Sequence, residues 1–177
     1  MTISHQDYTF EPFILADAIQ ERISALGQQI GQDYKDQNPL LLGILNGAFI
    51  FAADLMRAIS TPCEISFVKY ASYHGMASTG TVKELMGINE SLKGRHVVIV
   101  EDIVDSGETM SMLLDKVASH APASVEIASC LLKPDALQKD IQIKYLGFSI
   151  PNDFVIGYGL DYDGFGREIP DIYRVAK

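Results

Sequence analysis

The chain has 177 residues, of which 47% are hydrophobic, and its formal net charge is −9 at pH 7. This length and composition fit one domain, residues 1–177, with a buried core. The acidic balance argues against nucleic acid or anionic membranes as partners, because there is no basic excess to neutralise phosphates.

The first half of the chain predicts a helix, then a strand–helix unit and a further strand. Apolar residues recur at three- and four-residue spacing within 16–34, which is typical of an amphipathic helix. After a polar break, residues 40–45 predict a short buried strand and residues 48–59 an apolar helix. Residues 63–70 predict the next strand, and the small residues of 71–80 predict a loop or hairpin.

The second half predicts a strand–helix–strand unit with a right-handed crossover. Four apolar residues in a row, 97–100, suit a strand that is covered on both faces of a parallel sheet. We expect its helix at 110–120 and its second strand at 125–132. The segment 150–177 is rich in Gly, Asp, Tyr and Phe and predicts strands and loops. Together these elements predict an α/β fold with a central, mainly parallel sheet flanked by helices.

Two adjacent carboxylates, Glu101 and Asp102, follow the strand 97–100 at its expected end. Ligands of open α/β sheets bind beyond the carboxyl ends of the strands. Two like charges at such a place repel each other, and their burial is costly without a cation or hydroxyl groups. We therefore expect a cation or a polyol beside this pair.

The turn that follows, 105–109, combines a glycine and two hydroxyl side chains with a helix start. These are the ingredients of an anion site at a helix N-terminus. A simpler interpretation is a capping box, in which Asp105 and Glu108 satisfy free N–H groups of the helix. Both interpretations can hold together. The turn lacks the Gly-Lys-Ser/Thr ending of a Walker A loop, so it does not indicate hydrolysis of nucleoside triphosphates.

The stretch Val97–Thr109 resembles the phosphoribosyl-diphosphate motif of type I phosphoribosyltransferases: a hydrophobic strand, Glu-Asp, two apolar residues and Asp-Ser-Gly-x-Thr. Landmarks between residues 45 and 167 follow the order of the hypoxanthine-guanine branch of that family. The resemblance implies the type I phosphoribosyltransferase fold, with a core of about 36–145 and a small hood from about 1–15 and 146–177. It also implies purine salvage: Mg²⁺-dependent transfer of a phosphoribosyl group from 5-phosphoribosyl 1-diphosphate to N9 of hypoxanthine or guanine.

The resemblance implies roles for the residues that would hold the phosphoribosyl donor. Glu101 and Asp102 would bind the ribose hydroxyls, directly or through Mg²⁺, with Asp161 near a second Mg²⁺. Asp105 would also contact the donor, and as the acid/base it would exchange a proton with N7 of the purine. The 5′-phosphate would be held by Ser106, Gly107, Glu108 and Thr109, and the pyrophosphate by Leu45, Asn46, Gly47 and Arg167.

The pyrophosphate loop departs from the family at one position. Many relatives carry a basic residue where this chain has Asn46, so only backbone donors carry over. The resemblance also implies a non-proline cis peptide between Leu45 and Asn46. Ser72 and Tyr73 resemble the pair in a lid loop that closes over the reacting centre and excludes water.

The purine pocket of the family is matched by Lys133, Phe154, Val155 and Asp161. Lys133 would donate to the 6-oxo group, which favours hypoxanthine and guanine over adenine. A solvated strand end is the alternative for Lys133, and core packing is the alternative for Phe154 and Val155. An ion pair is the alternative for Asp161 and Arg167.

Two other functions stay open. A transferase of the same fold could prefer xanthine, because the residues that would contact the 2-position of the base are not legible. A non-catalytic regulator could bind phosphoribosyl diphosphate as an effector, although nucleic-acid binding by such a protein would need a basic surface. The resemblance further implies a homodimer or a homotetramer.

The expected location is the cytoplasm. Cys63 and Cys130 lie in separate apolar stretches and make no disulfide framework. The first ten residues lack the basic and apolar regions of a signal peptide. The longest apolar stretch, 40–53, is interrupted by Asn46 and too short to span a bilayer. We therefore expect no membrane partner.

Overall fold

The structure, a computed structural model, describes residues 2–72 and 82–176. Its helices and strands are β1 (Ile3–His5), β2 (Tyr8–Ile14), α1 (Ala16–Asp33), β3 (Leu40–Leu45), α2 (Phe49–Ala58), β4 (Glu64–Ser72), β5 (Val82–Met86), β6 (His96–Val104), α3 (Glu108–Ser119), β7 (Ser124–Leu132), the 3-10 turn η1 (Pro134–Ala136), β8 (Tyr145–Ser149), β9 (Val155–Ile156) and β10 (Ile172–Val175).

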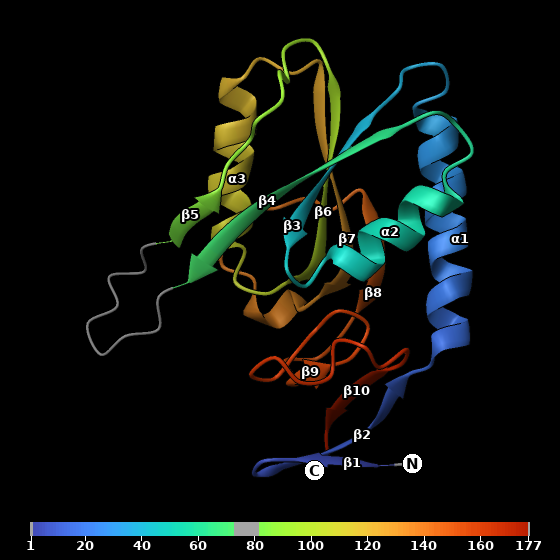
Figure 1. The fold of residues 1–177 in the computed structure, drawn as a ribbon, viewed down its shortest axis with the longest axis vertical. Coiled ribbons are helices and arrows are strands. Elements are labelled where there is room, and N and C mark those ends of the chain that lie inside the picture. The colour runs from blue at the N-terminus through green and yellow to red at the C-terminus, as the bar shows by residue number, and fades with distance from the viewer. Residues whose placement is uncertain (1, 73–81, 177) are drawn as a thin grey trace.

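A six-stranded sheet forms the centre of the molecule, in the strand order β5-β4-β3-β6-β7-β8 (Figure 1). The neighbouring strands from β4 to β8 are parallel, and β5 is antiparallel to β4. This confirms the predicted α/β fold with a mainly parallel sheet. The pairing of β4 with β5 agrees with the predicted hairpin, of which residues 73–81 lie outside the described part of the chain.

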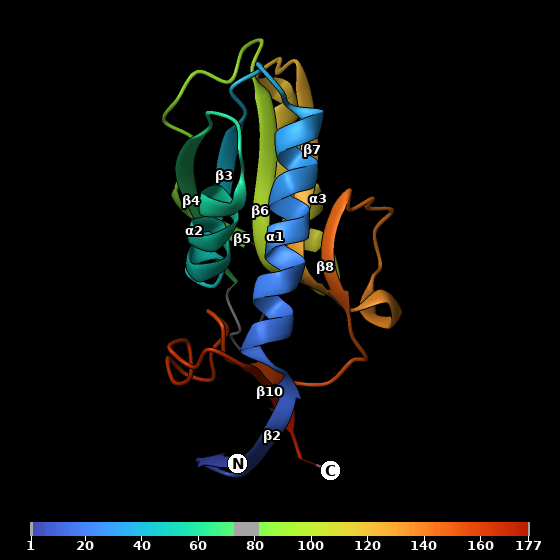
Figure 2. The ribbon, with the colours of Figure 1, turned by 90° about the vertical axis from the view of Figure 1, so that its right-hand side faces the viewer.

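Helices cover both faces of this sheet (Figure 2). Side chains of α1 and α2 join one buried cluster with Leu41, Val98 and Val100. Side chains of α3 join a second buried cluster with Leu42 and Ile99. Neighbouring residues of β6 therefore face opposite layers of helices. This explains why the strand has no alternation of polar and apolar residues.

A second, four-stranded sheet with the order β1-β2-β10-β9 joins segments from both ends of the chain. β10 pairs antiparallel with β2, with Ile172 opposite Ile14. Figure 1 shows this small sheet beyond the end of the large sheet to which the β4 arrow points. β8 belongs to the large sheet, with Tyr145 fully buried. The C-terminal contribution to the small sheet therefore begins at β9, later than the expected 146.

β6 is longer than predicted, which corrects the expectation that the strand ends before Glu101. β7 continues to pair with β6 up to Val104, opposite Leu132. The ladder between β6 and β3 ends earlier, at Val100 opposite Gly43. The two carboxylates therefore lie inside β6, in a stretch that its ladder with β7 holds in extended form.

The other predicted elements agree with the structure to within a few residues at their ends. α3 begins at Glu108, earlier than the predicted 110, and β3 has the predicted bounds. No helix within residues 2–72 and 82–176 is long and apolar enough to cross a membrane.

Candidate active site

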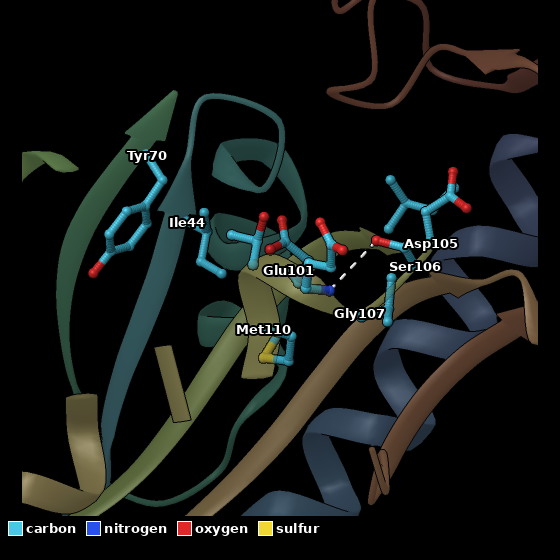
Figure 3. A pocket seen from close by; sticks show the side chains of 11 residues that line it. Ile44, Tyr70, Glu101, Asp105, Ser106, Gly107 and Met110 are labelled. Carbon is cyan, nitrogen blue, oxygen red and sulfur yellow. Dashed lines mark hydrogen bonds between the residues drawn. The ribbon is translucent and has the colours of Figure 1, made fainter. Parts of the chain in front are cut away.

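A cavity of about 210 Å³ lies where β6 ends and α3 begins (Figure 3). This place, beyond the carboxyl end of a parallel strand, is where an α/β sheet binds its ligands. The predicted turn 105–109 contributes all of its residues to the wall. The lining residues are Ile44, Tyr70, Glu101, Ile103, Val104, Asp105, Ser106, Gly107, Glu108, Thr109 and Met110.

The turn into α3 depends on a glycine. Gly107 precedes the helix with a left-handed φ of 83°. A Cβ there would also lie 2.6 Å from Cδ1 of Ile141, so a side chain would meet both strain and overlap. The first N–H groups of α3 have no partner within the helix, and they adjoin the cavity. This arrangement suits an anion.

The capping-box interpretation is wrong. The residue before α3 is Gly107, and no side chain caps the helix. The nearest interaction of this kind is long, 3.4 Å from the Glu108 N–H to Oγ of Ser106. The side chain of Asp105 instead pairs with Lys133, whose Nζ lies 3.2 Å from Oδ2 of Asp105.

The register of two parallel strands brings Asp105 and Lys133 together. Val104 and Leu132 are opposite residues of β6 and β7, and the Lys133 N–H donates to the Val104 carbonyl at 3.0 Å. Their successors are therefore neighbours at the same edge of the sheet. The Asp105 side chain is 54% exposed, whereas only 10% of the Lys133 side chain is exposed. Lys133 is thus a buried cation and not a solvated strand end.

Glu101 is buried and Asp102 is half-buried, and their two carboxylates interact. Burial, together with the negative charge of Asp102, raises the pKa of Glu101 well above its usual value. Burial also raises the pKa of Asp102, although a hydrogen bond with Glu101, the Ile103 N–H and the charge of Arg167 oppose it. The Ile103 N–H donates to Oδ1 of Asp102 at 2.8 Å. Like charges so placed need a shared proton or a cation.

The carboxylate pair fits one Mg²⁺, and Asp161 was expected near a second one. Within the described part of the chain, no cluster of three or more possible ligands occurs. Asp161 instead pairs with Arg167 at 2.7 Å and accepts the Gly164 N–H at 2.7 Å. Mg²⁺ often uses only one or two carboxylates, while substrate phosphates and water complete its shell. Glu101 and Asp102 supply these two carboxylates.

The loop after β3 adjoins this pair. The peptide between Leu45 and Asn46 is cis, as predicted. A Cβ at Gly47 would overlap the carboxylate of Asp102. Asn46 is exposed. The loop expected to bind pyrophosphate therefore lies directly against one of the two carboxylates.

The C-terminal tail lies against the same loop. A Cβ at Gly159 would overlap the carbonyl oxygen of Gly47. Arg167 donates to the Gly159 carbonyl at 2.6 Å and pairs with Asp161, so the ion-pair alternative for these two residues is present. The positive charge of Arg167 is close enough to lower the pKa of Asp102. The guanidinium is thus near the carboxylate pair but engaged within its own loop.

Phe154 and Val155, both expected in the purine pocket, differ in exposure. The Val155 side chain belongs to the core, in agreement with the packing alternative. Phe154 is 43% exposed and lies beside Tyr8, Phe10 and Tyr162, with ring centroids 5.6 to 6.3 Å away. The cavity lining includes neither Phe154 nor Val155.

Ser72 and Tyr73 are the two residues expected in the lid. Ser72 is the last residue of β4. Tyr73 lies outside the described residues.

Sequence reasoning missed several apolar and aromatic residues of the wall, above all Ile44, Tyr70 and Met110. Ile44 and Met110 give no signal, because they look like ordinary core residues. For Tyr70 the sequence does carry a signal of a ligand-facing position. It is the last residue of the predicted strand 63–70, and strand ends at this edge of the sheet face ligands.

Comparisons with known proteins agree on one family. The family model described as a phosphoribosyl transferase domain matches residues 14–163. The hypoxanthine-guanine phosphoribosyltransferase of Mycobacterium tuberculosis is 44% identical over 163 residues, which cover 88% of this chain and 81% of the relative. The hypoxanthine phosphoribosyltransferase of Salmonella typhimurium is 40% identical over 172 residues, covering 96% and 97%. A crystal structure of a hypoxanthine-guanine phosphoribosyltransferase from Bacillus anthracis has a TM-score of 0.88 at 35% identity, covering 94% and 97%.

Proposed function

The chain belongs to the phosphoribosyl transferase family, and on this premise we propose that it joins 6-oxopurines to a phosphoribosyl group. The donor is 5-phosphoribosyl 1-diphosphate, and the acceptors are hypoxanthine and guanine, as in the names of the relatives. The products are the purine nucleoside 5′-monophosphate and pyrophosphate. The single observation that carries this proposal is the cavity that combines the turn 105–109 with Glu101 of the carboxylate pair.

The donor is held by its two charged ends. The N–H groups at the start of α3 and the hydroxyls of Ser106 and Thr109 bind the 5′-phosphate. Glu101 and Asp102 would accept hydrogen bonds from the ribose hydroxyls and would hold Mg²⁺. The metal, when bound, neutralises charge on the leaving pyrophosphate. The loop 45–47 supplies backbone donors for that group, and Arg167 adds a guanidinium.

The pairing of Asp105 with Lys133 matches one edge of a 6-oxopurine. N7 and the 6-oxo group lie side by side on that edge. A carboxylate and an ammonium 3.2 Å apart can therefore address both atoms at once. Lys133 donates to the 6-oxo oxygen. With adenine the same ammonium would face an amino group, which is a poor partner.

Asp105 is the proton acceptor of the proposed reaction. As N9 forms its bond to C1′, the bond between C1′ and the pyrophosphate oxygen breaks, and the proton on N7 passes to the Asp105 carboxylate. C1′ becomes cationic in this step, and water would capture it. Exclusion of water is therefore the role we propose for Ser72 and Tyr73, and stacking on the base is the role we propose for Phe154. Val155 would contact the base through its backbone.

One assay tests the function directly. The protein is incubated with phosphoribosyl diphosphate, Mg²⁺ and one base at a time: hypoxanthine, guanine, xanthine or adenine. We expect nucleotide and pyrophosphate with hypoxanthine and guanine. A preference for xanthine would correct the acceptor, and the absence of product with every base would reject the proposal.

Assembly and location belong to the same proposal. We expect a homodimer or a homotetramer that acts in the cytoplasm. Light scattering after size-exclusion chromatography measures the mass of the assembly, and a monomer at micromolar concentration would contradict this expectation.

A further inference from the structure

The ring of Tyr70 forms one side of the cavity (Figure 3). In this view the ring lies on the β4 side, and Asp105 and Ser106 lie on the other side. The hydroxyl of Tyr70 points away from Asp105 and Ser106. Tyr70 thus presents its ring face or edge to the ligand and directs its polar end elsewhere.

The hydroxyl of Tyr70 is held by one charged residue, Glu84, which is held in turn by a second one, Lys116. It donates to Oε2 of Glu84 at 3.1 Å, and these residues are opposite each other in the β4–β5 ladder. The ammonium of Lys116, on α3, pairs with the same carboxylate oxygen. This series of contacts, which we call the Tyr70–Glu84–Lys116 network, therefore connects β4, β5 and α3.

Tyr70 and Glu84 keep one charge state around neutral pH. Burial, with the hydrogen bond and the negative charge of Glu84, raises the pKa of Tyr70 to about 12. The hydrogen bond from Lys116 lowers the pKa of Glu84. Tyr70 is therefore always a donor at neutral pH, and Glu84 is always a charged acceptor.

The Tyr70–Glu84–Lys116 network also links the two sides of the cavity. Lys116 lies about two turns along α3 from Glu108, the first residue of the helix and itself a residue of the cavity wall. The helix that offers its N-terminal N–H groups is thereby tied to the strand that carries Tyr70. These contacts restrain the Tyr70 ring relative to α3.

We propose that Tyr70 is a wall of the phosphoribosyl site, and that Glu84 and Lys116 are positioning residues that hold its ring in place for the sugar phosphate. The inference rests on the proposed function. A ring without its tether has more freedom in the empty site, and the donor must order it on binding. The Tyr70–Glu84–Lys116 network therefore affects the affinity for the sugar phosphate, and it does not affect the affinity for the base or the proton transfer.

Three variants test this inference: Tyr70→Phe, Glu84→Gln and Lys116→Met. Each removes one link and leaves the ring in place. We expect KM for phosphoribosyl diphosphate to rise about 5-fold, which is the worth of one net hydrogen bond. We expect kcat and KM for hypoxanthine to change less than 2-fold. In the double variant Tyr70→Phe/Glu84→Gln the rise stays close to that of one single variant, because both substitutions break the same link.

A matched control separates positioning from general stability. Glu64, on the same strand, pairs with Arg95 at 2.9 Å and is not a residue of the cavity wall. Glu64→Gln removes a comparable exposed ion pair, and its donor KM should equal that of the unchanged protein. Equal effects of Glu64→Gln and Glu84→Gln on donor KM would overturn the inference.

A binding measurement keeps this test independent of turnover. Calorimetry with ribose 5-phosphate, without Mg²⁺ or base, should show about 5-fold weaker binding for Glu84→Gln and Lys116→Met. Unchanged binding in both variants would overturn the inference. If the unchanged protein binds ribose 5-phosphate but forms no nucleotide with any base, the proposed function fails while the positioning inference stands on the binding data.

Discussion

The carboxylate of Asp102 lies so close to the backbone of Gly47 that no side chain fits at residue 47. Asp102 belongs to β6, and Gly47 belongs to the loop after β3. The contact therefore sets the distance between the carboxylate pair and the loop that we assign to pyrophosphate. A catalytic arrangement of this kind depends on placement to within about 1 Å.

Gly47→Ala should displace the Asp102 carboxylate and lower kcat/KM for phosphoribosyl diphosphate about 100-fold. Gly94→Ala is the control, since Gly94 has a φ of 70° but open space where a Cβ would lie. That change costs about 1 kcal/mol of stability and should leave the kinetics intact. Steady-state kinetics with circular dichroism measures both effects. Equal kinetics for Gly47→Ala and the unchanged protein would refute the importance of the contact.

Asp105→Asn should lower kcat about 100-fold or more, because the amide cannot accept the N7 proton. Donor KM should change far less. The control is Asp115→Asn, at an exposed position of α3. Steady-state kinetics at saturating base measures both variants, and an unchanged kcat in Asp105→Asn would remove Asp105 from the chemistry.

Lys133→Ala should erode the discrimination between hypoxanthine and adenine about 10-fold or more, since a charged hydrogen bond to the 6-oxo group is lost. The ratio of kcat/KM for the two bases is the quantity to compare. Lys144→Ala serves as the control, because Lys144 pairs with Asp33 at 3.2 Å and is not a residue of the cavity wall. Selectivity that survives Lys133→Ala means that the 6-oxo contact is misassigned.

Removal of divalent metal with EDTA should abolish nucleotide formation, and added Mg²⁺ should restore it. Asp102→Asn should raise the Mg²⁺ concentration needed for half-maximal rate, because one of two anionic ligands is lost. A Mg²⁺ titration of both proteins measures the shift. Full activity in EDTA would exclude the proposed role of the carboxylate pair as a metal site.

Tyr145→Phe should cost about 1 kcal/mol of stability at pH 7. The Tyr145 hydroxyl donates to Asp33 at 2.8 Å, and this bond and Lys144 lower the pKa of Asp33 below its ordinary value of 3.8. Because the folded pKa is the lower one, the stabilisation is present above about pH 4 and is lost as the pH falls through the folded pKa. Urea unfolding at pH 7 and pH 3 should show the difference between variant and parent shrinking at pH 3. A difference of equal size at both values would contradict this linkage.

Local patterns predicted the large sheet and its helices well, and non-local pairing explains the rest. The helix 16–34 and the strand 40–45 follow from the spacing of apolar residues alone. The extension of β6 through Glu101 and Asp102 depends on pairing with β7, which no local pattern reveals. The small sheet joins residues about as far apart as Ile14 and Ile172, and strand pairing at that separation leaves no mark in composition.

The site was predictable where position follows from strand ends. Lys133 and Asp105 follow neighbouring parallel strands, so their meeting could be expected once the strands were assigned. The helix start was mistaken, because a left-handed glycine replaces side-chain capping at Gly107. Tyr70 escaped notice because a tyrosine in an apolar strand looks like core. The ion pair between Asp161 and Arg167 was open in the sequence as an alternative, and only the folded loop shows that it forms.

The pairing of β2 with β10 also determines which part of the fold can form last during synthesis. When synthesis reaches residue 132, β3, β4, β6, α3 and β7 have been made, whereas Arg167 of the proposed donor site has not. β2 cannot pair with β10 until residues 172–175 have been synthesised. The small sheet is therefore the last part of the fold to be completed during synthesis.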